Sequence, residues 1–506
     1  MKNIIKGLIC LVLFLSGCGK DNGGDTPPVP KPDVNTLLVT QKVLTNSYLG
    51  NGPQWGGYDI VNAWTGNATL SEQDWNTLFK RVSFMRPSLI RIMVSQGWNY
   101  MNGEVYSPEK SDPVLGKILS YCQEKGITVQ LGEWGHVGGS GIDATWVDHA
   151  TDFLSYLVKE KGFTCIKYYT IVNEPNGDWS STVGSYPLWK NIIQQFYRKM
   201  NEKQLTDKVK IMGPDVAIWS IAETSWVVNT RNELAEEVKA FDIHAYPNND
   251  DVHTTSFLQL LKAYKAASNL DAPIIMGELG FKYSATSSLG KANASRIKAD
   301  PFAADDSQMH VYDAFYGIDM ADATIQVMLA GFGGVTYWDL DDAMYNDDGS
   351  SSSTKLKRWG FWNILGSEKF HNPDDEKIRP WFYTTSLLCR YFPSGSTIYD
   401  VTLPKPVKSG LRAIAGMRNG KVTIAIVNSS TNDYLFNLGM ENGALLQGIK
   451  TYKYQSQQGA HFIGTVDADG FASPVDAGET VDLSGGKLRE INSVSYTHLR
   501  AHETEL

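Results

Sequence analysis

From about residue 50 to residue 391, short apolar stretches alternate with amphipathic ones. Short apolar runs are typical of the buried strands of a parallel sheet, and amphipathic runs are typical of the helices that connect them. Eight such pairs predict an α/β fold, a (β/α)8 TIM barrel. The strands are expected at residues 57–61, 89–94, 128–132, 168–173, 209–213, 241–244, 273–277 and 334–338.

The helices of the barrel carry start and stop signals. Ser71 can cap the first helix, and Gly126 and Gly162 follow two helices at the position where a left-handed residue ends the turn. A Ser- and Ala-rich stretch, residues 281–306, is expected to be a long loop. The helices are expected at residues 72–85, 112–125, 144–161, 187–203, 225–238, 254–267, 309–330 and 380–391.

After Pro393 the pattern changes to short strand-like runs at residues 411–417, 422–428, 434–438 and 448–454. Asn419-Gly420 is a hairpin signal. We therefore predict a C-terminal antiparallel β-sandwich domain at 393–493 beside a catalytic barrel at 37–392, with residues 37–48 as a further strand of the sandwich. A structural support is favoured over a carbohydrate-binding module, because no exposed aromatic row is legible.

The N-terminus has the pattern of a secretory leader: Lys2 and Lys6, an apolar run, and then Leu15-Ser16-Gly17-Cys18. This tetrapeptide resembles a bacterial lipobox. The resemblance implies that residues 1–17 are removed and that a lipid on Cys18 anchors the chain to a membrane. Residues 18–36 would form a tether, and we expect the protein at the bacterial outer membrane or cell surface, with the periplasmic face as an alternative. A plain secreted protein is the other reading.

The composition limits which classes of molecule the protein is expected to bind. The 506 residues are 42% apolar and 20% charged with a formal net charge of −9, which argues against nucleic acid and suits a neutral ligand. Cys122, Cys165 and Cys389 are too widely spaced for a metal pattern and are expected to be buried thiols. No cofactor or metal is expected, and the oligomeric state is left open. Residues 494–506 look like a non-native or unstructured tail.

Two glutamates stand at expected strand ends, Glu174 in Asn173-Glu174-Pro175 and Glu278 after Gly277. Paired carboxyl groups are what glycosidic bond cleavage requires. The two motifs resemble those of the retaining glycoside hydrolases of clan A. The resemblance implies that Glu174 is the acid/base, with a raised pKa, and that Glu278 is the nucleophile. Within the clan, the Glu-Pro-Asn run and the C-terminal sandwich resemble family 39, whereas the Met-Gly-Glu-Leu-Gly run resembles family 5.

The other expected strand ends are polar and aromatic, and the catalytic groups of a TIM barrel come from this face. The resemblance implies that Arg91 and Tyr246 hold the nucleophile, that Asn173 binds the sugar 2-hydroxyl and that Trp338 is a platform under the sugar. His244 would line the same subsite or be a buried structural histidine. The remaining candidates for substrate binding are Trp98, Glu133, Trp134 and His136.

The sequence thus predicts a retaining β-glycoside hydrolase acting on an extracellular polysaccharide or oligosaccharide, with its two carboxyl groups about 5–5.5 Å apart. A non-catalytic glycan-binding lipoprotein and a transglycosylase are the alternatives. An acidic stretch after the last barrel strand does not match a calcium loop and is expected to be solvated or to contact sugar. It contains Asp339, Asp341, Asp342, Asp347 and Asp348.

Overall fold

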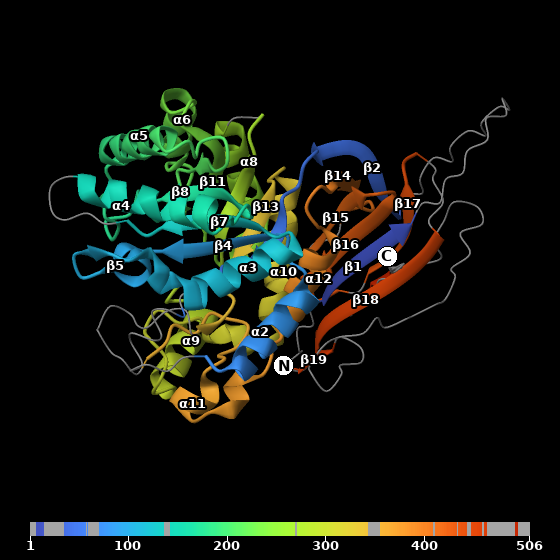
Figure 1. Cartoon of the computed structure of the whole chain (residues 1–506). Coiled ribbons are helices and arrows are strands. Elements are labelled where there is room, and N and C mark those ends of the chain that lie inside the picture. Colours follow the sequence, from blue (N-terminus) through green and yellow to red (C-terminus); the bar gives the residue numbers. More distant parts are fainter. Residues whose placement is uncertain are drawn as a thin grey trace.

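The first sheet is a parallel barrel that closes on itself (Figure 1). The computed structural model describes residues 7–14, 35–56, 58, 70–135, 142–268, 271–342, 355–407, 410–432, 434–442, 447–457, 460–462 and 491–493. β13 pairs with β3, and a parallel bridge between Gln54 and Arg91 joins the first strand to the second. The predicted TIM barrel is confirmed. Its strands are β3 (Gly50–Pro53), β4 (Leu89–Val94), β7 (Thr128–Glu133), β8 (Ile166–Ile171), β9 (Lys210–Met212), β11 (Val238–Ala245), β12 (Ile274–Leu279) and β13 (Gly334–Tyr337).

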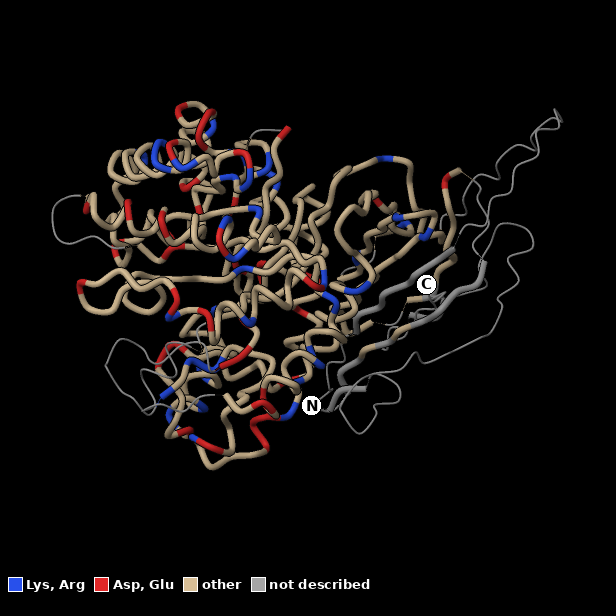
Figure 2. The backbone as a smooth tube through the Cα atoms, viewed as in Figure 1, with Lys and Arg blue, Asp and Glu red and all other residues tan. Residues whose placement is uncertain are grey.

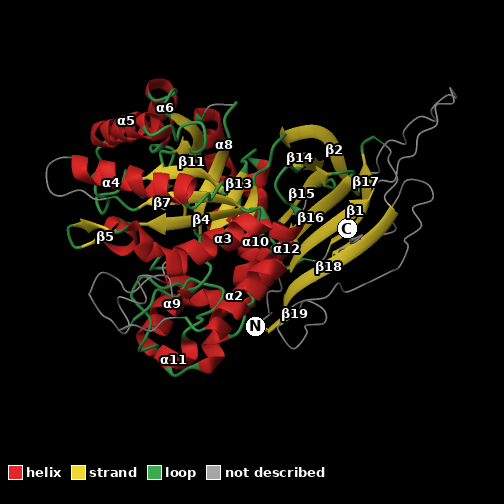
Figure 3. Ribbon diagram, viewed as in Figure 1, coloured by secondary structure: helices red, strands yellow, loops and turns green. Residues whose placement is uncertain are grey.

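Helices surround the barrel strands (Figure 3). The first one begins as predicted, because Ser71 and Asp74 form a capping box in which each side chain accepts a hydrogen bond from the other residue's backbone N–H. Gly126 and Gly162 have φ of +67° and +74°, as the predicted stops require. The main helices are α2 (Glu72–Met85), α3 (Lys117–Lys125), α4 (Ala144–Ser155), α5 (Tyr186–Glu202), α6 (Thr224–Glu233), α8 (Ser256–Ala267), α10 (Ala314–Leu329) and α12 (Trp381–Tyr391).

The first barrel strand is not where the sequence analysis placed it. β3 precedes residues 57–61, of which only Tyr58 is described. A Cβ on Gly52 would lie 1.8 Å from the carbonyl oxygen of Leu89, so this strand needs glycine to approach its neighbour. A Gly-Asn-Gly-Pro strand has no apolar pattern, and the hydrophobic reading therefore missed it.

The stretch expected to be a long loop contains a helix, α9 (Ser288–Ala299), and the expectation is wrong there. Ser287 caps it by accepting a hydrogen bond from the Gly290 N–H at 2.9 Å. Gly290 is its only buried residue. A helix with no apolar face gives no periodic signal, although its Ala, Lys and Arg residues favour helix.

The second sheet is almost entirely antiparallel, with strand order β19-β18-β1-β16-β15-β14-β2-β17-β20. The predicted C-terminal sheet is thereby confirmed. Asn419 and Gly420 have φ of +50° and +74° in the hairpin between β15 and β16. The strands are β1 (Gly7–Phe14), β2 (Thr36–Thr45), β14 (Thr397–Thr402), β15 (Leu411–Arg418), β16 (Lys421–Asn428), β17 (Tyr434–Met440), β18 (Gln447–Gln457), β19 (Ala460–Phe462) and β20 (Ile491–Ser493).

Two of these strands come from the N-terminal part of the chain. β2 lies between β14 and β17, so the segment before the barrel contributes to the second sheet. β1 lies between β16 and β18 and falls within the segment predicted to be a removable leader, which stays a prediction. A chain starting at Cys18 would lack β1, the common neighbour of β16 and β18. No helix among the described residues is both long and apolar enough to cross a membrane.

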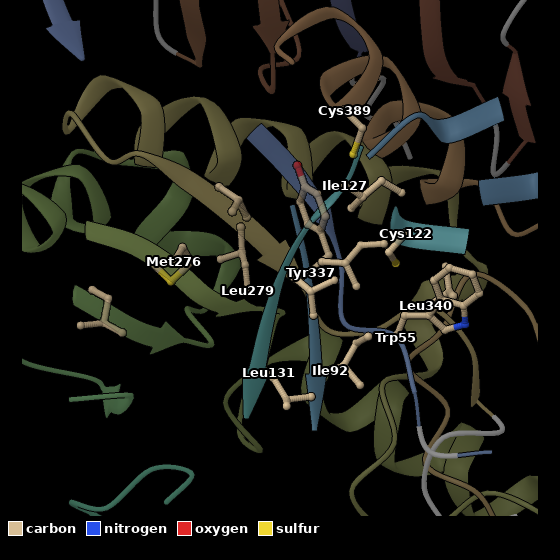
Figure 4. Close-up of a cluster of buried hydrophobic side chains, with 14 of the residues drawn as sticks. Trp55, Ile92, Cys122, Ile127, Leu131, Met276, Leu279, Tyr337, Leu340 and Cys389 are labelled. Atoms are coloured by element: carbon tan, nitrogen blue, oxygen red, sulfur yellow. The ribbon is translucent and has the colours of Figure 1, made fainter. Parts of the chain in front are cut away.

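The two sheets are joined through α10 and α12, which lie between them (Figure 1). The Tyr454 hydroxyl donates to the Ala314 carbonyl at 2.9 Å, and Arg412 Nε lies 3.2 Å from Asp322 Oδ1. The apolar core fills the space between barrel and helices and includes Cys122 and Cys389 (Figure 4). Cys122, Cys165 and Cys389 are buried and free, as predicted. Basic and acidic positions are interspersed over the barrel (Figure 2).

Candidate active site

Inside the barrel, the side chains near the amino ends of the strands are apolar, and those nearer the carboxyl ends are polar. Leu89, Met212, Ala240 and Ile275 form a small buried cluster. Further along the strands, the Gln130 side-chain amide donates to Thr170 Oγ1 at 2.8 Å and to Asp242 Oδ2 at 2.7 Å. Buried polar groups are expensive unless they are hydrogen-bonded. This network therefore directs the polar side chains toward the carboxyl ends of the strands.

Glu174 is held by an unusual backbone turn after β8. Val172 and Glu174 have φ of +68° and +47°, a region that β-branched residues in particular avoid. The Glu174 N–H donates to the Asp215 carbonyl at 3.1 Å, which fixes the turn to the loop after β9. Such strain is typical of functional sites and here sets where Asn173 and Glu174 project.

Glu278, near the end of β12, is 3% exposed and receives two short hydrogen bonds. Arg91 Nη1 donates to Oε1 at 2.5 Å, and the Tyr246 hydroxyl donates to Oε2 at 2.5 Å. The structure thus brings Arg91 and Tyr246 to Glu278. Arg91 also donates from Nη1 to Gln54 and from Nη2 to Asn173 Oδ1 at 2.7 Å.

His244 lies between the two glutamates. Its Nδ1 is 3.1 Å from Glu174 Oε1 and 3.5 Å from Glu278 Oε2, and its Nε2 is 2.8 Å from Asp215 Oδ1. A carboxylate oxygen of Glu174 and one of Glu278 lie within 4.8 Å of each other. Because both ring nitrogens face carboxylates, the imidazolium form can donate on both sides.

Asp215 belongs to this site and is absent from the sequence-based candidates. It is fully buried and accepts from Arg91 Nη2 at 3.0 Å as well as from His244. Its backbone N–H donates to Asp242 Oδ1 at 2.9 Å. The available signal was its position, because Gly213-Pro214-Asp215 directly follows the fifth strand. Gln54, after the first strand, was missed for the same reason that its strand was misplaced.

The pKa of Glu174 is lowered, whereas the sequence analysis expected it to be raised. Burial alone would raise it, but hydrogen bonds from His244 and from Trp179 Nε1, at 2.8 Å to Oε2, hold the pKa below its usual value. For His244, burial is outweighed by the Glu278 and Asp215 carboxylates, which keep its pKa well above normal. Burial raises the pKa of Glu278, although His244 and Arg91 oppose it. The hydrogen bonds from His244 and Trp179 therefore favour the ionised form of Glu174.

Glu133 is not brought to the two glutamates. Its Oε1 accepts from the Tyr100 hydroxyl at 3.2 Å and from Trp146 Nε1 of α4 at 3.4 Å, so it lies outside the barrel between β7 and its helix. Side chains alternate along a strand, and Gln130 faces the interior, so Glu133 must face outward. This corrects the sequence-based placement. Burial raises the pKa of Glu133 to about 8.

The other candidates have different surroundings. Trp338 follows β13 and is 8% exposed, and Trp134 follows Glu133 and is half-buried. Trp98 lies in a π-helical turn after β4 and is 37% exposed. His136 lies outside the described residues. The roles of these four side chains stay predictions.

The acidic stretch after β13 is buried where it is described, which corrects the expectation of a solvated or sugar-contacting loop. Asp342 Oδ1 accepts from the Trp359 and Gly360 backbone N–H groups at 2.9 and 2.7 Å. Arg379 Nη2 donates to Asp342 Oδ2 at 2.5 Å. Asp339 and Asp341 are likewise buried, and Asp347 and Asp348 lie outside the described residues. These carboxylates hold the loop together.

Within the described part of the chain, two sets of three side chains have metal-binding atoms close together: Glu174, His244 and Glu278, and Asp215, Asp242 and His244. His244 belongs to both sets. Arg91, at 2.5 Å from Glu278 and 3.0 Å from Asp215, already places a fixed cation between the carboxylates. A metal ion would have to compete with that guanidinium, so the arrangement is better suited to holding and moving protons.

Tyr246→Phe is expected to lower kcat/KM about 10-fold to 100-fold, because it removes a hydrogen bond to a charged group. The hydroxyl stabilises the ionised form of Glu278, so its loss raises the pKa of Glu278 and moves the acid limb of the pH profile to higher pH. Steady-state rates across pH 4–9 measure this. An unchanged acid limb would contradict the contact, and Tyr399 on β14, in the second sheet, offers the matched control Tyr399→Phe.

Glu133→Gln is expected to remove part of the pH dependence of stability. The carboxyl pKa is about 8 in the fold and about 4.3 when unfolded, so its contribution is complete below pH 4.3 and is lost as the pH rises to 8. We therefore compare the difference in Tm, variant minus wild type, at pH 4.5 and at pH 8. This difference should be about 2 °C or more higher at pH 8 than at pH 4.5. Thermal unfolding at both pH values tests this, and a constant difference would contradict it.

Comparison with known proteins extends this picture. No family model matches the sequence, and neither does any curated protein. Among solved structures, a monomeric β-xylosidase from Caulobacter crescentus CB15 is 11% identical with a TM-score of 0.56, over 92% of this chain and 99% of the other. An α-L-arabinofuranosidase from Thermotoga maritima is 12% identical with a TM-score of 0.56 and the same coverage. The chain has the fold of the clan A glycoside hydrolases.

The likeness covers the barrel together with the second sheet. The endo-β1,6-glucanase BT3312 is also similar, at 14% identity and a TM-score of 0.55, over 90% of this chain and 96% of the other. The resemblance read from the two glutamate motifs is confirmed at the level of the fold. The printed activities of these three enzymes differ in sugar and in linkage, so the fold by itself leaves the substrate open.

Proposed function

We propose that the protein is a retaining β-glycoside hydrolase that cleaves an extracellular polysaccharide or oligosaccharide. The observation that carries this proposal is the separation of less than 4.8 Å between carboxylate oxygens of Glu174 and Glu278. Retaining enzymes hold their carboxyl groups about 5–5.5 Å apart, whereas inverting enzymes need about 6.5–9.5 Å to fit a water molecule. The fold of the neighbours supports the same conclusion.

In the proposed first step, a Glu278 oxygen attacks the anomeric carbon while Glu174 gives its proton to the glycosidic oxygen. The bond between that carbon and oxygen breaks, the leaving sugar departs as an alcohol, and a glycosyl ester of Glu278 forms. Arg91 and Tyr246 hold Glu278 in place through the hydrogen bonds described above. Asn173, fixed by Arg91, is placed to bind the sugar 2-hydroxyl.

In the second step, Glu174 takes a proton from water, and the hydroxide formed displaces Glu278 from the anomeric carbon. Glu174 is then protonated and Glu278 is free, as at the start. His244, charged and bonded to Glu174 and Asp215, compensates the negative charge of the carboxylates during both steps. Two inversions at one carbon leave its configuration unchanged.

The stereochemistry of the product tests this proposal. The purified protein is screened for reducing-sugar release on β-linked glucans, mannans and xylans, and the first product is followed by proton NMR. We expect the β-anomer to appear first and the α-anomer to grow in by mutarotation. The α-anomer first would overturn the retaining mechanism. Binding of a glycan without cleavage would instead favour a non-catalytic receptor.

The predicted lipid on Cys18 is a separate part of the proposal and rests on the lipobox-like tetrapeptide alone. In a bacterial host, the full chain should enter the membrane fraction and incorporate labelled palmitate. Cys18→Ala should do neither. Equal labelling of both chains would contradict the anchor.

A further inference from the structure

Three tryptophans of the described chain expose more than a third of their side chains: Trp98, Trp179 and Trp219. All three follow barrel strands at the carboxyl ends, on the same face as the two glutamates. Trp179 is 61% exposed and Trp219 is 62% exposed, and their ring centroids are 6.3 Å apart with planes inclined by 51°. A single exposed indole is ordinary, but two exposed rings side by side form an apolar surface of the kind that binds ligands.

The two loops that carry these rings are joined to each other. A Cβ on Gly177 would lie 2.3 Å from Trp179 Cε2, so the missing side chain lets the indole lie across its own loop. Asn176 joins this loop to the segment before Trp219: its Nδ2 donates to the Ala217 carbonyl at 2.7 Å, and its Oδ1 accepts from the Ala217 N–H at 3.0 Å. The bases of the two loops are thus fixed relative to each other, while the exposed Trp179 ring is free to turn.

Trp179 also contacts the proposed acid. Its Nε1 donates to Glu174 Oε2 at 2.8 Å, while His244 is hydrogen-bonded to Oε1 and Glu278 lies beyond His244. The acid protonates the oxygen of the leaving group, so the leaving group extends from Glu174 on the side away from Glu278. Trp179 and Trp219 occupy that side.

Each Glu174 oxygen therefore has an N–H partner, and these two hydrogen bonds favour the ionised carboxylate over the protonated acid that the leaving oxygen needs. His244 is fully buried and held by Asp215, so it cannot withdraw. Trp179 is exposed and can. The other charged groups near Glu174 are Asp215 after β9, Glu278 on β12 and, through Asn173, Arg91 on β4.

We propose that Trp179 and Trp219 form the subsite for the leaving group, that this subsite takes the apolar face of a pyranose ring, and that seating the ring releases Trp179 Nε1 from Glu174. The inference rests on the proposed hydrolase function and adds a requirement for a sugar on both sides of the cleaved bond. Glu174 is then protonated more readily when a leaving group is present.

The test compares oligosaccharides of the glycan that the wild type cleaves with the 2,4-dinitrophenyl glycoside of the same sugar, whose leaving group needs no proton. We expect Trp219→Ala to raise KM for the oligosaccharides about tenfold and to leave the aryl glycoside little changed. Ile221→Ala, an exposed residue on the same loop, is the matched control and should behave as the wild type.

Trp179→Phe keeps an aromatic ring and loses the N–H. We expect the basic limb of kcat/KM, which reports the free enzyme, to move to higher pH, and the limb of kcat to stay in place. Wild-type KM and pH profiles in both variants would overturn this inference while leaving the hydrolase function intact. If the wild type cleaves no glycan, its tryptophan fluorescence is titrated with oligosaccharides. A fluorescence quench that is lost in Trp219→Ala supports the subsite, and no quench in the wild type overturns it.

Discussion

Glu278→Gln is expected to lower kcat about 10⁴-fold or more on every substrate, including glycosides with reactive leaving groups. The amide has nearly the shape of the carboxylate but cannot form the glycosyl ester. Steady-state rates measure the loss, and a mass spectrum of the wild type with a slow 2-fluoro glycoside should show the sugar attached to Glu278.

The matched control is Glu104→Gln, an exposed glutamate in the turn after β4 that contacts none of the site residues described here. It should retain wild-type activity. The change at Glu278 also alters a buried ion pair, since Arg91 lies 2.5 Å away, so circular dichroism must show that the variant is folded. A folded Glu278→Gln protein with more than a few per cent of wild-type activity would contradict its role as nucleophile.

Glu174→Ala is expected to lower kcat about 10²-fold to 10⁴-fold on oligosaccharides, because general acid catalysis is lost. The effect on the 2,4-dinitrophenyl glycoside should be smaller in the first step, since that leaving group departs without a proton. The glycosyl ester should then accumulate, giving a burst followed by a slow rate.

Sodium azide provides a sharper readout for the same variant. Azide needs no general base, so it should accelerate turnover of Glu174→Ala and give the β-glycosyl azide, with the configuration of the substrate. It should leave the wild type and Glu278→Gln unaffected. An α-glycosyl azide, or equal losses on both kinds of substrate, would assign Glu174 a different role.

Local sequence signals predicted most of the barrel because each one acts over a few residues. Ser71 and Asp74 fix the start of α2, and Asn419-Gly420 fixes a hairpin, through contacts within a single turn. The same applies to Glu174 and Glu278, since a strand followed by a polar residue places that residue at the carboxyl end of the barrel. Their approach to within 4.8 Å then follows from closing the sheet.

Other features had no local signal. β3 is made of Gly-Asn-Gly-Pro, and its neighbours approach the two glycines too closely for a side chain at either position. α9 has no buried face. Glu133 ends a strand as Glu278 nearly does, but strand alternation turns it outward to Trp146. One residue of register decides between the two outcomes, and register is set by the whole sheet.

The sequence by itself determined the α/β barrel, the second sheet and the two glutamates, because periodicity, caps and turns are properties of adjacent residues. Only the tertiary structure decided that Asp215 and His244 join those glutamates, that Trp179 reaches the acid, and that the pKa of Glu174 is lowered. Contacts across the site link residues up to 187 positions apart, as between Arg91 and Glu278, and a pKa depends on every charge near the group. Such neighbours are chosen by packing and not by the order of residues in the chain.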